Sequence, residues 1–282
     1  MKIKEAFWSV FNELKNKYGE NESGSILDLI FEDMGYPKKQ RLIHADQELK
    51  ADKYARLISI KKRLLEHRPV QYILGYAWFM EEKFFVNENV LIPRQETEEL
   101  VELIINENKN RQINILDVGT GTGCIAISLR MAIPSAQIYT SDKSETALAT
   151  AMKNAIWHKT DVSFIHDDIL DPDPTKYPKE IDLIVSNPPY LTSSSWMSIP
   201  DNVKKYEPIE ALFVPGNDPL LYYKKILLFA YEKLSSQGKV YFEINEEFGS
   251  EIKELLENNN FVNVKIIKDI HGKNRIAFAQ KK

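Results

Sequence analysis

Four consecutive residues, Asn187-Pro188-Pro189-Tyr190, combine hydrogen-bonding groups with a rigid backbone. They follow the nearly continuous apolar run at residues 181–185, which is typical of a parallel strand that is covered on both faces. Pro188 ends such a strand because it has no N–H to donate, and Pro189 restricts Pro188 to an extended conformation. The backbone beyond the strand is therefore stiff, and its carbonyl groups are free to face a ligand.

The chemistry that this corner can support is the positioning of a planar –NH2 group. Such a group has two N–H donors in one plane, and two fixed acceptors, the Asn187 amide oxygen and the Pro188 carbonyl oxygen, would hold both of them. The face of the nitrogen then points toward an electrophile, and no strong base is required. Tyr190 supplies a flat ring. For this stretch alone, an ordinary strand end with a Pro-Pro turn and a core tyrosine is an equal alternative.

A glycine-rich segment favours the chemical interpretation of the corner. The apolar run at residues 113–118 leads into Gly-Thr-Gly-Thr-Gly at 119–123, and a helix is predicted over 124–131. Glycines permit a tight turn and a close approach of the backbone to a ligand at the carboxyl end of a strand. Asp142 follows about twenty residues later, where it can accept hydrogen bonds from ribose hydroxyls. The G-x-G-x-G spacing fits a dinucleotide fingerprint poorly, and with Asp117 ahead of it resembles the S-adenosylmethionine loop of class I methyltransferases.

Composition indicates a soluble, cytoplasmic protein of about two domains. The 282 residues are 43% hydrophobic, which is enough for a large core, and no run of some 18 apolar residues suggests a membrane span. The first residues do not resemble a signal peptide. The single cysteine, Cys124, excludes an internal disulfide, and the five histidines lack the spacing of metal ligands, so no metal is expected.

The hydrophobic pattern divides the chain into a helical part and an α/β part. Apolar residues recur at helical spacing through residues 1–75, with a helix ending at Gly19 and the next starting near Ser25, which predicts a small helical bundle that serves as a docking domain. Aromatic and β-branched residues at 76–93 predict a β-hairpin linker. Strands and helices alternate over 94–282, which predicts a mostly parallel seven-stranded sheet with ligands at the carboxyl ends of its central strands.

Other polar residues are candidates for the rim of the site. Asp168 and Ile169 follow a predicted strand and would lie against an adenine, although an aspartate there is as often a turn residue. Residues 191–206 are interpreted as a lid over Asn187, and a plain surface loop fits them equally well. Arg94 and Glu96, at the start of a predicted helix, are candidates for touching a ligand. The alternative for Glu96 is an ordinary complement to the helix dipole, because acidic residues are common in a first turn.

With these motifs described, the chain is identified as a member of the PrmC/HemK family, the peptide chain release factor N5-glutamine methyltransferases. The likeness covers nearly the whole chain. It rests on residues 68–75, on Ile92-Pro93-Arg94 with Glu96-Thr97-Glu98, on the glycine loop, on 187–190, on Tyr206-Glu207-Pro208 and on 269–275. Asn-Pro-Pro-Tyr alone occurs in several amino-methyltransferases, so the linker motifs carry the narrower assignment. Three positions depart from the family pattern: Gln95 replaces a proline, Pro219 a glycine and Ile169 a residue that is often aromatic.

The resemblance implies methyl transfer from S-adenosyl-L-methionine to the side-chain amide nitrogen of the glutamine in the Gly-Gly-Gln motif of bacterial release factors. It implies catalytic roles for Asn187, Pro188 and Tyr190, and a substrate site formed by residues 187–190, including Pro189. The residues that it assigns to the cofactor are Gly119, Thr120, Gly121, Thr122, Gly123, Asp142, Ile169 and Asn187. The expected partner is a release factor, without direct binding of nucleic acid or membrane, and a monomer is the default expectation.

Two alternatives to this function stay open. The first is a methyltransferase that acts on a nucleic-acid base, at adenine N6 or guanine N2. Such an enzyme must hold a planar –NH2 group in the same way, and it would flip the base out of the stacked strand. Residues 1–75 carry a net charge of +3 and the remainder −7, and this acidic catalytic part argues against nucleic acid. A protein that binds the cofactor without catalysis is the second alternative, which the intact loop and corner disfavour.

Overall fold

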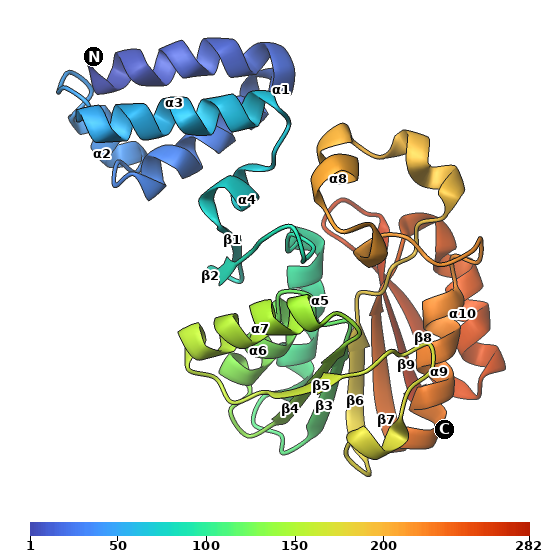
Figure 1. Cartoon of the computed structure of the whole chain (residues 1–282). Helices are drawn as coiled ribbons and strands as arrows, with labels where there is room; N and C mark the ends of the chain where they lie inside the picture. The colour runs from blue at the N-terminus through green and yellow to red at the C-terminus, as the bar shows by residue number, and fades with distance from the viewer. The chain divides into compact units, whose positions relative to one another are not determined.

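The computed structural model describes all residues from 1 to 282 and divides them into two compact units (Figure 1). The first unit comprises Met1–Gly75 and Pro200–Tyr206, and the second comprises Tyr76–Ile199 and Glu207–Lys282. None of the helices combines the length and the apolar character that crossing a bilayer requires.

Four helices build the first unit around one apolar core. They are α1 (Ile3–Asp33), α2 (Lys38–Ile43), α3 (Ala51–Leu65) and α4 (Val70–Leu74). The apolar residues that recur at helical spacing are the buried ones, among them Val10, Leu27 and Leu57. The expected helical bundle is therefore present.

The long helix α1 changes direction at Gly19. This residue has φ 76° and ψ 171°, and helical geometry resumes directly after it. The expected start of a second helix near Ser25 is therefore wrong by several residues. The physical reason is that a single glycine accommodates the change of direction, so no connecting loop is needed.

A short helix from the middle of the chain completes the first unit. The Tyr206 hydroxyl at the end of α8 (Asp201–Tyr206) donates to the Glu66 carbonyl oxygen, just beyond α3, over 2.9 Å. Residues 191–206, which the sequence presented as one lid, are thus divided, because η2 (Ser193–Ser198) belongs to the second unit. The hydrogen bond between Tyr206 and Glu66 joins residues 140 positions apart, so no local sequence pattern predicts this division.

A seven-stranded sheet forms the centre of the second unit. In spatial order its strands are β5 (Ser163–His166), β4 (Gln137–Asp142), β3 (Asn114–Val118), β6 (Ile181–Ser186), β7 (Leu234–Glu243), β9 (Asn274–Lys281) and β8 (Phe261–Lys268). The first five are parallel, and β9 is antiparallel to both of its neighbours. The predicted mostly parallel sheet is therefore confirmed. A separate antiparallel hairpin precedes it, formed by β1 (Tyr76–Phe79) and β2 (Glu82–Phe85).

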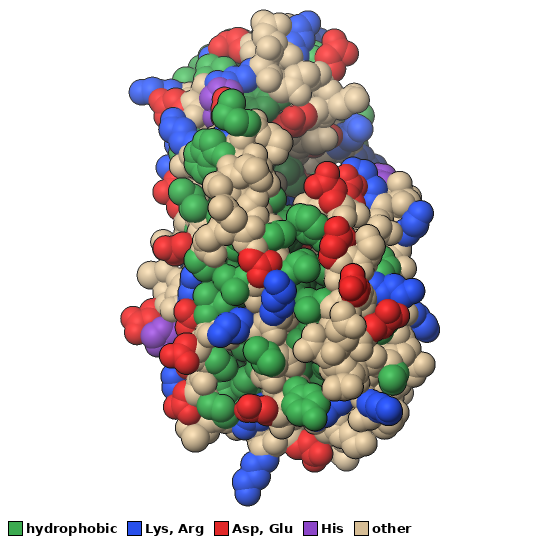
Figure 2. Space-filling view, turned by 90° about the vertical axis from the view of Figure 1, so that its right-hand side faces the viewer, with side chains coloured by type: hydrophobic (Ala, Val, Ile, Leu, Met, Phe, Trp, Pro, Cys, Tyr) green, Lys and Arg blue, Asp and Glu red, His purple; other side chains and the backbone are tan.

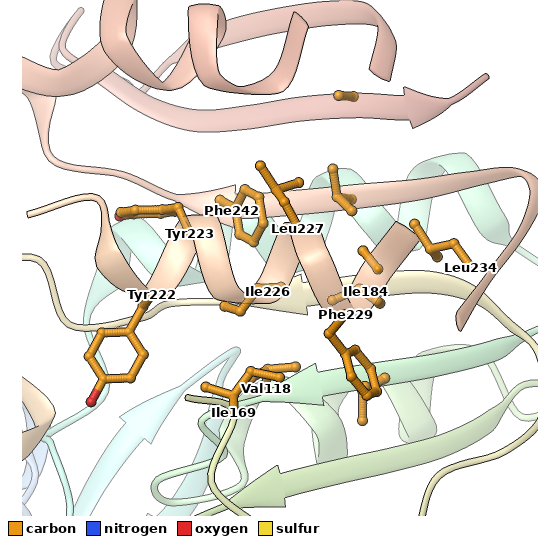
Figure 3. Close-up of a cluster of buried hydrophobic side chains, with 14 of the residues drawn as sticks. Val118, Ile169, Ile184, Tyr222, Tyr223, Ile226, Leu227, Phe229, Leu234 and Phe242 are labelled. Atoms are coloured by element: carbon orange, nitrogen blue, oxygen red, sulfur yellow. The ribbon is translucent and has the colours of Figure 1, made fainter. Parts of the chain in front are cut away.

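Helices cover both faces of the sheet because successive residues in a strand point to opposite sides. Leu183 and Val185 of β6 pack on the side of α5 (Gln95–Asn108), α6 (Cys124–Ala132) and α7 (Glu145–His158). Ile184 lies on the other side with α9 (Leu221–Lys233) and α10 (Gly249–Asn258). Figure 3 shows this second cluster, with Ile226 of α9 beside the sheet residues Ile184 and Phe242. The remaining short helices are η1 (Pro174–Lys176), η3 (Ile209–Ala211) and η4 (Glu246–Phe248).

The register of the central strands brings three segments to one edge of the sheet. Val118 at the end of β3 pairs with Ser141 of β4 on one side and with Ser186 of β6 on the other. The Ser186 hydroxyl also donates to the Val118 carbonyl oxygen over 2.7 Å. Since the chain continues from β3 first to one side and later to the other, a crevice opens at these carboxyl ends. The glycine loop, Asp142 and Asn187 all begin at this edge.

Candidate active site

Two cavities open at the carboxyl ends of the central strands. The larger has a volume of about 860 Å³ and the smaller about 350 Å³, each counted with the space at its mouth. Residues 187–189 line both of them. The Asn-Pro-Pro corner is therefore a wall that the two cavities share, and groups bound in the two cavities would meet at this corner.

The glycine loop and the residue that ends β4 line the larger cavity. Gly119, Gly121 and Asp142 belong to its wall. The Gly119 N–H donates to the Ser141 carbonyl oxygen over 2.8 Å, and the Gly121 N–H donates to Oδ2 of Asp142 over 3.0 Å. The loop is thus tied to β4 through its backbone, which leaves the surface of the loop open to a ligand.

Asp142 has acceptor capacity left after it has bound the loop. Its Oδ1 accepts from the Ser144 N–H over 2.9 Å, and its Oδ2 accepts from Gly121. A carboxylate offers about four acceptor positions, so two are left for hydroxyls in the cavity. Burial raises the pKa of Asp142 above its ordinary value, and these two N–H donors oppose that shift.

Three residues of the loop that the resemblance assigned to the cofactor, Thr120, Thr122 and Gly123, do not belong to the wall of the larger cavity. The Thr122 hydroxyl oxygen accepts an N–H of the first turn of α6 over 3.3 Å, and Thr120 is only 4% exposed. Gly123 has φ +81°, and a Cβ there would lie 3.0 Å from the side chains of Ala151 and Ile127. These residues support the loop, and their direct contact with a cofactor stays a prediction.

Apolar side chains close another side of the larger cavity. Ile169, which lies beyond β5, is 8% exposed and lies beside Val118 in Figure 3. Tyr222 of α9 lines the same cavity. Asp168 also lines it, and its Oδ1 accepts the Leu170 N–H over 2.9 Å in a local turn. A wall of this kind suits a flat aromatic base.

A buried acid beneath the glycine loop has one unpaired oxygen. Oδ2 of Asp117 accepts from the Thr140 hydroxyl over 2.9 Å, whereas Oδ1 has no hydrogen-bond partner in the protein. Burial raises the pKa of Asp117 to about 7. The Thr120 hydroxyl, which also has no partner at hydrogen-bond distance, lowers the pKa of Asp117 as the Thr140 hydroxyl does, so these two unpaired groups complement each other within the protein.

A chain of two hydrogen bonds holds Asn187 in place at the shared wall. Its Nδ2 donates to Oγ1 of Thr97 over 3.3 Å, and the Thr97 hydroxyl donates to Oε2 of Glu243 over 2.5 Å. The Asn187 Oδ1 and the Pro188 carbonyl oxygen accept no hydrogen bond within the protein. The structure therefore leaves free the two acceptors that the sequence proposed for a planar –NH2 group.

Of the two partners that hold Asn187, the sequence analysis named Thr97 only within a family motif and did not name Glu243 at all. It is the last residue of β7 and is 3% exposed, and its neighbours in sequence are apolar. Burial raises its pKa to about 7, and the hydrogen bond from Thr97 opposes the rise. An acidic residue at the end of an apolar strand could have revealed it, because such residues are seldom buried without a partner or a function.

Arg94, whose role the sequence left open, forms an ion pair at the end of the linker. Its Nη2 lies 2.7 Å from Oε1 and 2.8 Å from Oε2 of Glu207. Oε2 of Glu207 also accepts the Ile92 N–H over 3.3 Å. Arg94 and Tyr190 both line the smaller cavity, and burial raises the pKa of Tyr190. The ion pair thus holds one wall of this cavity in place.

A doubly wound sheet with this loop, this acid and this corner defines a class I methyltransferase. Solved structures share the fold. A methyltransferase from Pyrococcus furiosus is 17% identical with a TM-score of 0.52, covering 82% of this chain and 99% of that one. The 16S rRNA N2 G1207 methyltransferase of T. thermophilus is 16% identical with a TM-score of 0.52, covering 73% of this chain and 50% of that one.

Sequence comparison narrows the class to one family. The PrmC N-terminal domain matches residues 5–75, and the methyltransferase small domain matches residues 95–199. The release factor glutamine methyltransferase of Flavobacterium psychrophilum is 45% identical over 269 residues, 93% of each chain. That of Bacteroides thetaiotaomicron is 44% identical over 236 residues, 83% of each chain. The chain belongs to the family of release factor glutamine methyltransferases, as the sequence resemblance predicted.

Proposed function

We propose that this enzyme transfers a methyl group from S-adenosyl-L-methionine to the side-chain amide nitrogen, N5, of the glutamine in the Gly-Gly-Gln motif of peptide chain release factors. The names of its relatives support release factors as substrates and glutamine as the acceptor. One observation carries the proposal. Residues 187–189 line both cavities, and their two acceptor oxygens, on Asn187 and Pro188, are unused within the protein.

The larger cavity suits S-adenosyl-L-methionine. Gly119 and Gly121 allow a close approach of the backbone, and Asp142 has acceptor positions left for ribose hydroxyls. Ile169 offers an apolar surface to the adenine. When bound, this cofactor supplies an electrophilic methyl group on a positively charged sulfur.

The corner then positions the substrate for attack on that methyl group. Asn187 Oδ1 and the Pro188 carbonyl oxygen accept the two N–H groups of the glutamine amide, so the face of its nitrogen points away from both acceptors. The same two oxygens stabilise the positive charge that develops on the nitrogen. Tyr190 walls the pocket, and the surplus proton leaves to water afterwards.

In this proposal the two units have separate tasks. Residues 1–75 dock the release factor, residues 76–93 link the parts, and residues 94–282 hold the methyl-transfer site. The helical unit has an apolar core of its own, which supports an independent module.

The rival substrate, a nucleic-acid base, has no specific support in this structure. On the face drawn in Figure 2, basic and acidic side chains are interspersed, without a continuous basic stripe. Proteins that follow a phosphate backbone generally present such a stripe.

A methyl-transfer assay tests the proposal. Labelled S-adenosyl-L-methionine is offered with a release factor, with its variant carrying alanine for the motif glutamine, and with RNA. We expect label only on the unaltered release factor. Label on RNA, or equal label on both release factors, would overturn the proposed substrate.

A further inference from the structure

The two ends of the Asn187 carboxamide have opposite hydrogen-bonding character. Its oxygen accepts, whereas its –NH2 group donates, and the two ends are nearly equal in size. If the amide turned by 180°, donors would face the donors of a substrate amide, and the corner would repel the group that it should hold. A methyltransferase of this design therefore needs a device that sets the orientation of Asn187.

Thr97 provides the first part of such a device. Its hydroxyl has a single hydrogen, and that hydrogen is donated to Oε2 of Glu243 over 2.5 Å. The hydroxyl oxygen can then only accept from Asn187, which donates through Nδ2 over 3.3 Å. Since an ionised carboxylate has no hydrogen to give, Glu243 dictates the direction of both hydrogen bonds.

Glu243 is placed firmly enough to act in this way. Its backbone carbonyl oxygen accepts from the buried Tyr223 hydroxyl over 3.0 Å, which pins the end of β7. The nearby cation Arg275 pairs with Asp269 over 3.2 Å, and Arg94 pairs with Glu207. An acid that is 3% exposed and has no ion pair of its own destabilises a fold, so its presence calls for another reason.

We propose that Thr97 and Glu243 are positioning residues, and that the ionised Glu243 carboxylate, acting through the Thr97 hydroxyl, turns the oxygen of Asn187 toward the substrate amide. This inference rests on the proposed function, because it concerns how the same corner holds its –NH2 group. Neither residue touches the reacting atoms in this account. Glu243 also lines the smaller cavity, and the inference assigns its effect on the substrate amide to the hydrogen bonds through Thr97 and Asn187.

Protonation of Glu243 reverses the chain of donors. The protonated carboxyl group donates to the Thr97 oxygen, and the Thr97 hydrogen becomes available to the oxygen of a turned Asn187. Because burial raises the pKa of Glu243 to about 7, this reversal falls near neutral pH. The other titratable groups around the Glu243 carboxyl are Arg94 and Glu96 near the start of α5, Cys124 on α6, Tyr190 beyond β6, Tyr223 on α9 and Arg275 on β9.

Paired variants of Thr97 test the orientation. Thr97→Val keeps the shape and removes the hydroxyl, and Thr97→Ser keeps the hydroxyl and removes a methyl group. With both substrates saturating at pH 8, we expect kcat to fall about 10- to 100-fold in Thr97→Val, and we expect Thr97→Ser to recover most of it. Calorimetry should show a Kd for S-adenosyl-L-methionine within about threefold of wild type for both. A wild-type kcat in folded Thr97→Val overturns the inference.

The dependence of kcat on pH in Glu243→Gln distinguishes a positioning role from a merely structural role, because loss of a structural contact would not change the shape of that dependence. We expect wild-type kcat to rise as pH increases from 6 to 8, and we expect this limb to disappear in Glu243→Gln, which cannot ionise. A flat wild-type profile, or a limb that survives in Glu243→Gln, overturns the inference and leaves the proposed function intact. Absence of release factor methylation by the wild-type enzyme at every pH defeats the proposed function instead.

Discussion

The proposed cofactor side of the site and its proposed substrate side are built in different ways. On the cofactor side the backbone of the glycine loop binds Asp142, and the hydrogen bond from Gly121 joins residues 21 positions apart. On the substrate side Asn187 depends on Thr97, 90 positions away, and Thr97 on Glu243, 146 positions away. The first wall is made of backbone from neighbouring segments, and the second is made of side chains from three distant ones.

This difference predicts different sensitivities. A wall of glycine backbone tolerates changes in its surroundings, but an added Cβ strains it, because the glycines adopt positive φ angles. A wall of hydrogen-bonded side chains depends on single atoms, because each member sets the role of the next. Substitutions on the two sides should therefore affect different measurements.

The largest expected effect lies on the substrate side. Asn187→Ala removes one of the two acceptors for the amide, so we expect kcat to fall about 100- to 1000-fold. The Kd for S-adenosyl-L-methionine, measured by calorimetry, should change far less, because the loop and Asp142 are intact. Nearly normal turnover in this variant would defeat the role of the corner, and an equal loss of cofactor binding would break the comparison of the two walls.

A smaller effect is expected from the glycine loop, where Gly123 and Gly119 form a matched pair. Their φ angles are +81° and +82°, but a Cβ at Gly123 meets Ala151 and Ile127 at 3.0 Å, and a Cβ at Gly119 meets nothing within 4 Å. Alanine at either position costs about 1–2 kcal/mol of stability for the left-handed backbone, and at Gly123 about 1–3 kcal/mol more for overpacking.

Urea unfolding of the two alanine variants measures this difference. We expect Gly123→Ala to be the less stable protein and Gly119→Ala to be the weaker binder of S-adenosyl-L-methionine, because Gly119 lines the cavity. Equal stability of the two variants would show that the loop relaxes around the added Cβ.

The smallest effect concerns the pH dependence of stability. The pKa of Glu243 is about 7 in the folded protein and 4.5 ordinarily, so the folded state retains a proton that the unfolded chain releases. Stability from this group is therefore present at low pH and is lost as pH rises through about 7. We expect Glu243→Gln to reduce the loss of unfolding free energy between pH 5 and pH 8 by about 1–3 kcal/mol.

Glu254→Gln serves as the control for this measurement, since Glu254 is an exposed residue of α10. Its unfolding free energy should depend on pH as that of the wild type does. If Glu243→Gln follows the control, Glu243 is not a buried acid that the fold holds at a cost. If Glu243→Gln instead loses less stability than the wild type as the pH rises, then the ionised Glu243 carboxylate, which orients Asn187, is also the form that destabilises the fold.

Most of the architecture was predictable because it follows from local pattern. Apolar spacing located the helical unit and the strands, and the glycine loop and the proline corner were visible as short motifs. Predictions of where one element ends and the next begins were less accurate. At Gly19 the chain turns without a loop, and residues 191–206 divide between the two units because Tyr206 bonds to Glu66.

By itself the sequence determined the class of sheet, the ligand edge and the residues of the corner, since hydrophobic period, proline and glycine act on the backbone where they stand. Only the tertiary structure decided which side chains complete that corner. The sequence analysis assigned no role to Glu243 and named Thr97 only within a family motif, and folding alone connects both to Asn187 through hydrogen bonds. Hydrogen-bond partners so distant along the chain are chosen by the packing of the whole unit, which no local pattern records.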